Sequence, residues 1–212
     1  MICAIVLAAG ESRRMGSQKL LLPFGATTVI AHIVDQLTRS AVDEVYVVVG
    51  HEGYRIEEEL AGQPLTIVTN PSYKSGMLSS VRRGLDALPE RCDAAMVALG
   101  DQPSITADLV DEMIGAFDST DKGILVPIYC GKRGHPIVFS ASYREEILTH
   151  YDGVGLRGLL EAHPEDISEL NVATPSVLAD MDSPNDYRRE VTSHEERTHE
   201  KRAKESEQND TG

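Results

Sequence analysis

Cysteines and long apolar runs are scarce in this chain, and their scarcity excludes several classes of protein. The 212 residues include only Cys3, Cys92 and Cys130, which lie far apart and form no C-x-x-C pair. The sequence therefore predicts neither a zinc site nor a disulfide framework. No apolar run approaches the length that crosses a bilayer, and no positively charged leader precedes an apolar segment at the start. We expect a cytoplasmic protein without a membrane partner.

Positive charge is scarce as well. The chain carries 34 acidic residues against 20 lysines and arginines, which gives a formal net charge of −14 at pH 7. A nucleic-acid surface needs a stripe of basic residues for the phosphates, and the sequence contains none. We therefore expect any bound nucleotide to be a small molecule. The hydrophobic content of 41% fits one α/β core and hence a single domain.

Short apolar runs alternate with amphipathic patterns along most of the chain. Residues 45–49 and 94–99 are apolar runs that end in glycine, as buried parallel strands do. Residues 28–37 and 77–88 place apolar side chains, Met77 among them, on one helical face. Further strands are predicted near residues 2–6, 65–68, 123–127, 137–139 and 170–172, and a further helix near residues 107–117. The alternation predicts an α/β fold with a mainly parallel sheet, whose ligands bind at the carboxyl ends of strands.

The first apolar run leads directly into a loop of small and cationic residues. Residues 7–19 read L-A-A-G-E-S-R-R-M-G-S-Q-K. Small residues and Gly10 let backbone N–H groups converge on an anion, because no large side chain blocks the approach. Arg13, Arg14 and Lys19 add cations for phosphate oxygens. We interpret the segment as a loop for a nucleotide triphosphate, since a simple connecting turn would explain the glycines but not three cations.

A carboxylate follows the strand predicted at residues 94–99. Asp101 belongs to the run G-D-Q-P and lies at the carboxyl edge of the predicted sheet. Magnesium prefers one or two carboxylates together with phosphate oxygens and water. Capping of a nearby helix is the alternative role for Asp101, but Thr106 can fill it. We therefore predict that Asp101 binds magnesium.

Two further aspartates precede the last predicted helix. Asp180 and Asp182 are two residues apart in an extended segment, so their side chains are expected on one face. They can complete a magnesium site with Asp101. Capping by Asp182 or Ser183 is compatible with this role.

A second glycine-rich loop precedes the strand predicted at residues 137–139. Residues 131–136 read G-K-R-G-H-P. The glycine N–H groups and the basic side chains suit an anionic ligand such as a phosphate monoester. A tight turn whose histidine packs under a neighbouring strand is the alternative.

A polar segment leads into the helix predicted at residues 77–88. It runs from Asn70 to Ser80 and includes Gly76 and Ser79. These residues can line a base or ribose. The hydroxyls also fit an ordinary first helical turn.

These motifs, in this chain order, resemble those of the molybdenum-cofactor-type nucleotidyltransferases. Residues 7–19 match the signature L-A-[AG]-G-x-S-x-R-M-G-x-x-K at every fixed position, and match neither Walker A nor G-x-G-x-x-G. Residues 131–136 resemble the family's G-x-x-G-H-P loop at the acceptor, and residues 70–80 its N-x-x-x-x-x-G-M-x-x-S segment at the base and ribose. Residues 180–186 resemble its D-x-D-T-P-x-D element, with Ser183 where threonine is usual.

The resemblance implies a Rossmann-like three-layer α/β/α fold of the nucleotide-diphospho-sugar transferase type. The family catalyses attack by a phosphate on the α-phosphorus of a nucleoside triphosphate, with release of pyrophosphate, so a Mg²⁺ cofactor is implied. The implied catalytic residues are Lys19, Arg14 and Asp101, and the implied metal ligands are Asp101, Asp182 and Asp180. The residues implied in nucleotide binding are Leu7, Ala8, Ala9, Gly10, Ser12, Arg13, Met15, Gly16, Lys19, Gly76, Ser79 and Ser80. Those implied in acceptor binding are Arg133, Gly134, His135 and Pro136.

The first loop also bears on the choice of nucleotide. Guanylyl-transferring relatives usually carry L-A-G-G, whereas this chain has Ala9, as the cytidylyl-transferring branch does. The resemblance implies transfer of CMP from CTP to molybdenum-loaded molybdopterin, with the cytosine dinucleotide product passing to a molybdoenzyme or its chaperone. Other acceptors or bases within the class are alternatives: a guanylyltransferase or a sugar-phosphate or alcohol-phosphate nucleotidyltransferase. A glycosyltransferase and a nucleotide-binding regulatory module without turnover are alternatives from other classes.

The composition changes at the C-terminal end. Residues 190–212 contain seven acidic and four basic residues and almost no apolar residue beyond Val191. This predicts a nucleotidyltransferase domain over residues 1–189 and a charged, disordered or transiently helical tail over residues 190–212. A solvated extension and a partner-binding tail are both compatible with this composition.

Overall fold

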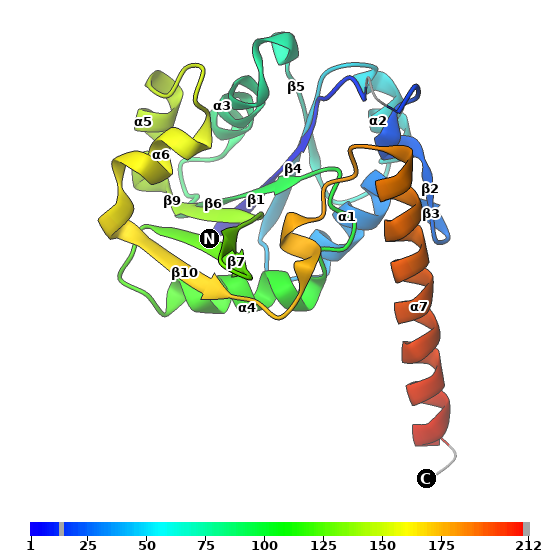
Figure 1. The fold of residues 1–212 in the computed structure, drawn as a ribbon. Coiled ribbons are helices and arrows are strands. Elements are labelled where there is room, and N and C mark those ends of the chain that lie inside the picture. Colours follow the sequence, from blue (N-terminus) through cyan, green and yellow to red (C-terminus); the bar gives the residue numbers. More distant parts are fainter. Residues whose placement is uncertain (13–14, 210–212) are drawn as a thin grey trace.

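An eight-stranded sheet forms the centre of the computed structural model, which describes residues 1–12 and 15–209, with side chains up to residue 199 (Figure 1). The strands lie in the order β10-β7-β9-β6-β1-β4-β5, and β8 pairs with β7. Most neighbours are parallel, but β9 runs antiparallel between β6 and β7. The strand bounds are β1 Ile2–Ala8, β4 Glu44–Val49, β5 Thr66–Thr69, β6 Ala94–Leu99, β7 Ile124–Tyr129, β8 Lys132–Arg133, β9 Ile137–Ser140 and β10 Ile167–Asn171, with β2 Pro23–Phe24 and β3 Thr27–Thr28 in a separate hairpin.

Helices cover both faces of this sheet. Their bounds are α1 Val29–Thr38, α2 Gly53–Glu59, α3 Met77–Ala87, α4 Ala107–Asp118, α5 Arg144–Thr149, α6 Leu156–Ala162 and α7 Pro184–Asn209. Buried side chains of α1, α2 and α4 share one core with Ala4 and Val6 of β1. Those of α3, α5 and α6 share a second core with Cys3 and Ile5, because alternate residues of a strand face opposite sides. This arrangement confirms the predicted three-layer α/β/α fold with a mainly parallel sheet.

The predicted elements lie close to the observed ones. β6 spans the predicted residues 94–99, and α1, α3 and α4 each begin and end within about one residue of prediction. Sequence patterns missed α2, α5 and α6, because helices of six or seven residues contain too few apolar positions to establish a period. The missed helices matter for function, since α6 begins at a cavity described below.

The last helix, α7, crosses the boundary predicted at residue 190. It continues to Asn209, and Figure 1 shows its final turns extending away from the domain. Glu190 is buried and accepts a hydrogen bond from the Ser104 hydroxyl, and the rings of His194 and Phe24 have centroids 4.5 Å apart. The predicted tail is thus helical as far as residue 209 and packed on the domain where it begins. Periodicity did not reveal this, because the contacts are polar and aromatic rather than an apolar stripe.

No helix within the described ranges combines the length and apolar character that a bilayer span requires. The longest, α7, has 26 residues, and most of them are polar or charged.

Candidate active site

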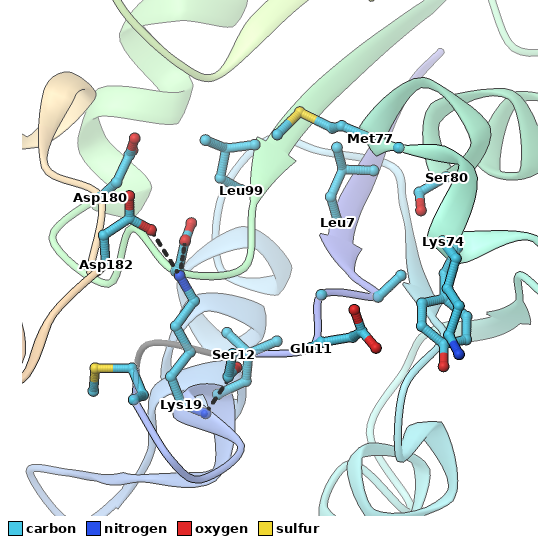
Figure 2. Close-up of a pocket in the computed structure, with 17 residues that line it drawn as sticks. Leu7, Glu11, Ser12, Lys19, Lys74, Met77, Ser80, Leu99, Asp180 and Asp182 are labelled. Carbon is cyan, nitrogen blue, oxygen red and sulfur yellow. Dashed lines mark hydrogen bonds and ion pairs between the residues drawn. The ribbon is translucent and has the colours of Figure 1, made fainter.

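A cavity of about 610 Å³, here called the first cavity, opens at the carboxyl edge of the sheet where β1 and β6 end (Figure 2). Four segments line it: the loop after β1, the start of α3 with the turn before it, the end of β6, and the segment before α7. Gly100 allows β6 to end close to β1, because a Cβ there would lie 2.8 Å from the Leu7 carbonyl oxygen. The predicted motifs therefore meet at the edge where parallel α/β sheets bind ligands.

The loop after β1 is held by a buried glutamine that sequence patterns did not reveal. Gln18 is 6% exposed, and its amide donates to the carbonyl oxygens of Gly10 and His51, at 3.4 and 3.3 Å. Its carbonyl oxygen accepts from the Ser12 hydroxyl at 2.8 Å, and the same hydroxyl accepts from the Lys19 N–H at 3.1 Å. Gln18 occupies an unconstrained position of the family signature, so only the structure identifies it. The backbone at Lys19 is fixed by this network.

The structure brings part of the predicted loop to the first cavity. Ala8 lies outside the lining, in the core shared with α1, and Gly16 also lies outside it. The predictions for Arg13 and Arg14 concern residues outside the described part of the chain. The predicted loop residues that do line the cavity are Leu7, Ala9, Gly10, Ser12, Met15 and Lys19. Their role in nucleotide binding stays a prediction.

The Lys19 ammonium joins the three segments that carry the predicted catalytic groups. It forms a short ion pair with the Asp101 carboxylate, and its Nζ lies 3.4 Å from Asp182 Oδ1 (Figure 2). It also donates to the Met181 carbonyl oxygen at 2.9 Å. The Lys19 side chain is only 14% exposed, whereas that of Asp182 is 58% exposed. The predicted cation and two of the predicted carboxylates therefore form one cluster.

Asp180 lines the same cavity but has a different partner. Its Oδ1 accepts a hydrogen bond of 2.6 Å from Gln102 Nε2, which also donates to the Val177 carbonyl oxygen at 3.3 Å. Burial raises the pKa of Asp180, and the negative charges of Asp101 and Asp182 add to this. Gln102 is 1% exposed and its Oε1 has no hydrogen-bond partner among the described residues. Gln102 thus positions the segment that carries Asp180.

The donor set of the first cavity fits a hard divalent cation shared with a substrate. The described residues contain no group of three or more histidine, cysteine, aspartate or glutamate side chains arranged to hold a metal ion. Asp101 and Asp182 nevertheless both contact the Lys19 ammonium. Magnesium commonly binds through one or two carboxylates and takes its other ligands from phosphates and water. The two carboxylates suit such an ion when a triphosphate is also present.

The start of α3 supplies the opposite wall of the first cavity. Gly76 and Ser80, both predicted to bind the nucleotide, line this wall, while the Ser79 hydroxyl donates to the Gly76 and Ser72 carbonyl oxygens, at 2.8 and 3.0 Å. Buried Asn70 donates to both serine hydroxyls at 3.0 Å. Ser79 therefore holds the backbone of this wall in place and does not itself line the cavity.

Met77 departs from its prediction. Periodicity placed it on the buried face of α3, but it is 59% exposed and lines the first cavity. It is the first residue of the helix, where the following turns do not yet cover the side chain. Tyr73 and Lys74, in the turn before α3, also line the cavity without belonging to a predicted motif position.

A second cavity, of about 300 Å³, shares Met77 with the first and contains three of the four predicted acceptor residues. Arg133, Gly134 and His135 line it, whereas Pro136 is buried outside the lining. Its other walls are mainly apolar and include Leu78, Val81, Val126, Ile137 and Leu160. The second cavity is therefore an apolar pocket with basic groups at its rim.

The loop at residues 131–136 is fixed to the segment before α7. A Cβ on Gly134 would lie 2.3 Å from the Val177 carbonyl oxygen, which also accepts the His135 N–H at 2.9 Å. Burial lowers the pKa of His135, while Asp101 acts in the opposite direction. Arg133 pairs with Glu169, with 2.8 Å between Nη2 and Oε1. Glycine is required at position 134 because the two backbones touch there.

Residues from the start of α6 complete the second cavity. Val154, Gly155, Leu156 and Arg157 line it, and Val154 is 52% exposed. Residues 153–158 form a G-x-G-x-x-G pattern, but it follows the helix α5 rather than a strand. It therefore lacks the structural context of a dinucleotide-binding loop.

The chain matches the model of a known family over most of its length. Residues 4–167 match the family described as MobA-like NTP transferase domain. The molybdenum cofactor cytidylyltransferase of Escherichia coli K12 is 28% identical over 191 residues, which cover 88% of this chain and 93% of that protein. The nicotine blue oxidoreductase of Paenarthrobacter nicotinovorans is 28% identical over 189 residues, covering 86% and 92%. Relatives of similar identity thus carry names from different reaction classes.

A solved structure shares the fold. The protein Rv0371c of Mycobacterium tuberculosis H37Rv, in complex with manganese, superimposes with a TM-score of 0.76 at 26% sequence identity. The superposition covers 91% of this chain and 98% of that protein.

Proposed function

The chain belongs to the MobA-like NTP transferase family, and we propose that it transfers CMP from CTP to the phosphate of molybdenum-loaded molybdopterin, with release of pyrophosphate. One observation carries the proposal: the cluster of Lys19, Asp101 and Asp182 at the edge of a cavity bounded by the loop after β1. Nucleotidyl transfer needs aligned phosphates, a divalent cation and positive charge where the leaving pyrophosphate forms. The loop after β1 can align the phosphates, the two carboxylates can hold the cation, and Lys19 supplies positive charge, all around one cavity.

In this proposal the triphosphate lies along the loop after β1. Backbone N–H groups near Gly10 and Ser12 bind phosphate oxygens, and Lys19 neutralises charge that develops on the leaving pyrophosphate. Asp101 and Asp182 would hold the divalent cation, which would supply positive charge to offset the charge of the triphosphate. Gln102 donates a hydrogen bond to Asp180 and so holds this third carboxylate in the first cavity. No residue is required as a nucleophile, because the acceptor phosphate attacks the α-phosphorus.

The base occupies the part of the first cavity nearest Ala9 and α3. Ala9 is 6% exposed, and its methyl group lies 2.9 Å from the position that a Cβ on Gly50 would take. Because Ala9 lines the first cavity, its methyl group leaves less space for a purine edge than a glycine would. The cytidylyltransferase name of the relative from Escherichia coli supports the same base. Guanylyl transfer is the alternative that a test must exclude.

The acceptor occupies the second cavity in this proposal. Arg133 and the Gly134 loop provide a basic rim for its phosphate, and Met77 forms the wall between the two substrates. The apolar lining favours an acceptor with a flat or apolar body over a sugar phosphate. Molybdopterin has this character.

Release of pyrophosphate tests the proposal. Purified protein is incubated with Mg²⁺, molybdenum-loaded molybdopterin and CTP, GTP, ATP or UTP in separate reactions. We expect release with CTP, and at least about a 100-fold loss in the Asp101→Asn variant. Asp86→Asn, an exposed aspartate on α3, is the matched control and retains activity. Preference for GTP would replace the assigned base, and no release with any nucleotide would contradict the proposed reaction.

A further inference from the structure

The Lys19 ammonium contacts both of the carboxylates that could hold a divalent cation. It contacts Asp101 and lies 3.4 Å from Asp182, and it is largely shielded from solvent. Both carboxylates line the first cavity with Lys19. An ammonium and a divalent cation cannot share this space, because both need the same oxygen atoms and repel each other. The Lys19 ammonium is therefore a cation that the two carboxylates already hold within the first cavity.

The backbone segments that carry the two carboxylates are joined without the help of Lys19. The Met181 N–H donates to the Asp101 carbonyl oxygen at 3.0 Å, and Met181 is fully buried. This backbone contact joins the segment before α7 to the end of β6 independently of any side chain. Movement of the lysine side chain would therefore leave the segments of Asp101 and Asp182 beside one another rather than disperse them.

Only the side chain of Lys19 needs to move. Its backbone N–H is held by the Ser12 hydroxyl at 3.1 Å, and Ser12 belongs to the loop that faces the first cavity. Four methylene groups link this fixed point to the ammonium, which gives the side chain a wide choice of rotamers. A polyphosphate bound on the loop would offer the ammonium new anionic partners within that reach.

We propose that Lys19 acts as an internal cation that keeps a divalent metal out of the nucleotide-free site and leaves the carboxylates when a triphosphate binds. This inference rests on the proposed function, because it assigns the triphosphate to the loop after β1. It gives Lys19 two positions, one on the carboxylates and one on the phosphates. It makes nucleotide and metal binding mutually dependent, since each favours the same displacement of Lys19.

Manganese binding to nucleotide-free protein tests this exchange without any turnover. Free Mn²⁺ is measured by electron paramagnetic resonance in titrations of the wild type, Lys19→Met and Lys19→Arg. We expect Lys19→Met to bind Mn²⁺ at least about tenfold more tightly than the wild type, because a neighbouring opposite charge changes the proton affinity of a carboxylate by about 10- to 1,000-fold. Lys19→Arg keeps the charge and should bind as weakly as the wild type. Lys122→Met, on the surface away from both cavities, is the control.

Two further variants make the outcome decisive. Asp101→Asn combined with Lys19→Met should lose the gain, which assigns the bound Mn²⁺ to the carboxylates. If Lys19→Met lowers the unfolding temperature, Lys19→Gln repeats the titration with a polar side chain. Equal Mn²⁺ affinity in wild type and folded Lys19→Met or Lys19→Gln would overturn the exchange. A tenfold gain in Lys19→Met, together with a wild type that releases no pyrophosphate with any nucleotide, would instead support exclusion of the metal by Lys19 and contradict the proposed reaction.

Discussion

The two cavities differ in the residues that line them. The first is lined by loops that follow strands and contains Lys19 with the carboxylates Asp101, Asp180 and Asp182. The second has apolar walls from α3, α6 and β9, and its charged groups lie at the rim. Charge assembled beside backbone donors suits a triphosphate and its metal, whereas an apolar pocket with basic rim groups suits the body and phosphate of an acceptor. Under the proposed function the first cavity binds the nucleotide and the second binds the acceptor, and substitutions can test the two assignments separately.

The largest expected effect is at the backbone contact beneath the second cavity. Gly134→Ala places a Cβ 2.3 Å from the Val177 carbonyl oxygen, so the loop must move. We expect kcat/KM for the acceptor to fall at least about 100-fold, since a displacement of about 1 Å can cost that much. CTP affinity, measured by calorimetry, should change by less than about twofold. Gly115→Ala, in α4 with open space around it, is the control and keeps both values.

Equal losses of CTP affinity and acceptor affinity in Gly134→Ala would mean that binding in one cavity is energetically coupled to binding in the other.

Gln102 offers a way to disturb both cavities with one substitution. Its amide binds Asp180 in the first cavity and the Val177 carbonyl oxygen, which also holds the loop of His135. We expect Gln102→Ala to lower kcat about tenfold, because a hydrogen bond to a charged group contributes about 1.5–3 kcal/mol. The KM values for CTP and acceptor should both rise. Steady-state kinetics with each substrate varied provides the measurement.

Gln63→Ala, which changes a glutamine outside both cavities, should match the wild type. A rise confined to the KM for CTP would limit Gln102 to the first cavity.

A smaller effect is expected at the rim of the second cavity. Arg133 is half exposed and shares its charge with Glu169, so its contribution to binding a phosphate is moderate. Arg133→Gln should raise the KM for the acceptor about fivefold to tenfold and leave kcat and the KM for CTP unchanged. Glu169→Gln frees Arg133 from its partner and should lower the KM for the acceptor. A higher KM for CTP in Arg133→Gln would place this arginine in the nucleotide site.

The smallest effect on catalysis is expected at His32, which lines neither cavity. Its titration should change the stability of the fold instead. His32 packs with His194 and Phe24, and burial lowers its pKa to about 4, assisted by the charges of His194 and Arg197 and opposed by Asp35. The unfolded chain then binds more protons than the folded one, so stability falls as pH falls below about 6.5. We expect His32 to contribute a loss of about 2 kcal/mol between pH 7 and pH 5.

Urea unfolding of wild type and His32→Phe at the two pH values measures this loss. The free energy of unfolding should fall less in His32→Phe than in the wild type between pH 7 and pH 5. An equal fall in both proteins would show that His32 is not the cause.

The sequence predicted the first cavity better than the second. Asp101 stands out because a charged residue directly after a continuous apolar strand has no role in the core, and Lys19 because it ends a loop of small and cationic residues. The walls of the second cavity, such as Leu78, Val81 and Ile137, have the same pattern as ordinary core residues. Met77 was assigned to that core because periodicity does not show where a helix stops being covered.

Other features depend on tertiary contacts that no local pattern encodes. Gln18 and Gln102 are ordinary polar residues in the sequence, yet each is buried and joins distant segments. The antiparallel direction of β9 follows from its pairing with β6 and β7, not from its own residues. Glu190 was placed in a solvated tail because its partner, Ser104, lies 86 residues away.

A crystal structure with a non-hydrolysable CTP analogue and Mn²⁺, with the anomalous signal of manganese recorded, tests the assignment of the first cavity. We predict a manganese peak at coordination distance from the Asp101 and Asp182 carboxylates, with the triphosphate on the loop after β1 and the Lys19 ammonium turned toward it. A manganese ion bound elsewhere, or a triphosphate seated in the second cavity, would contradict it.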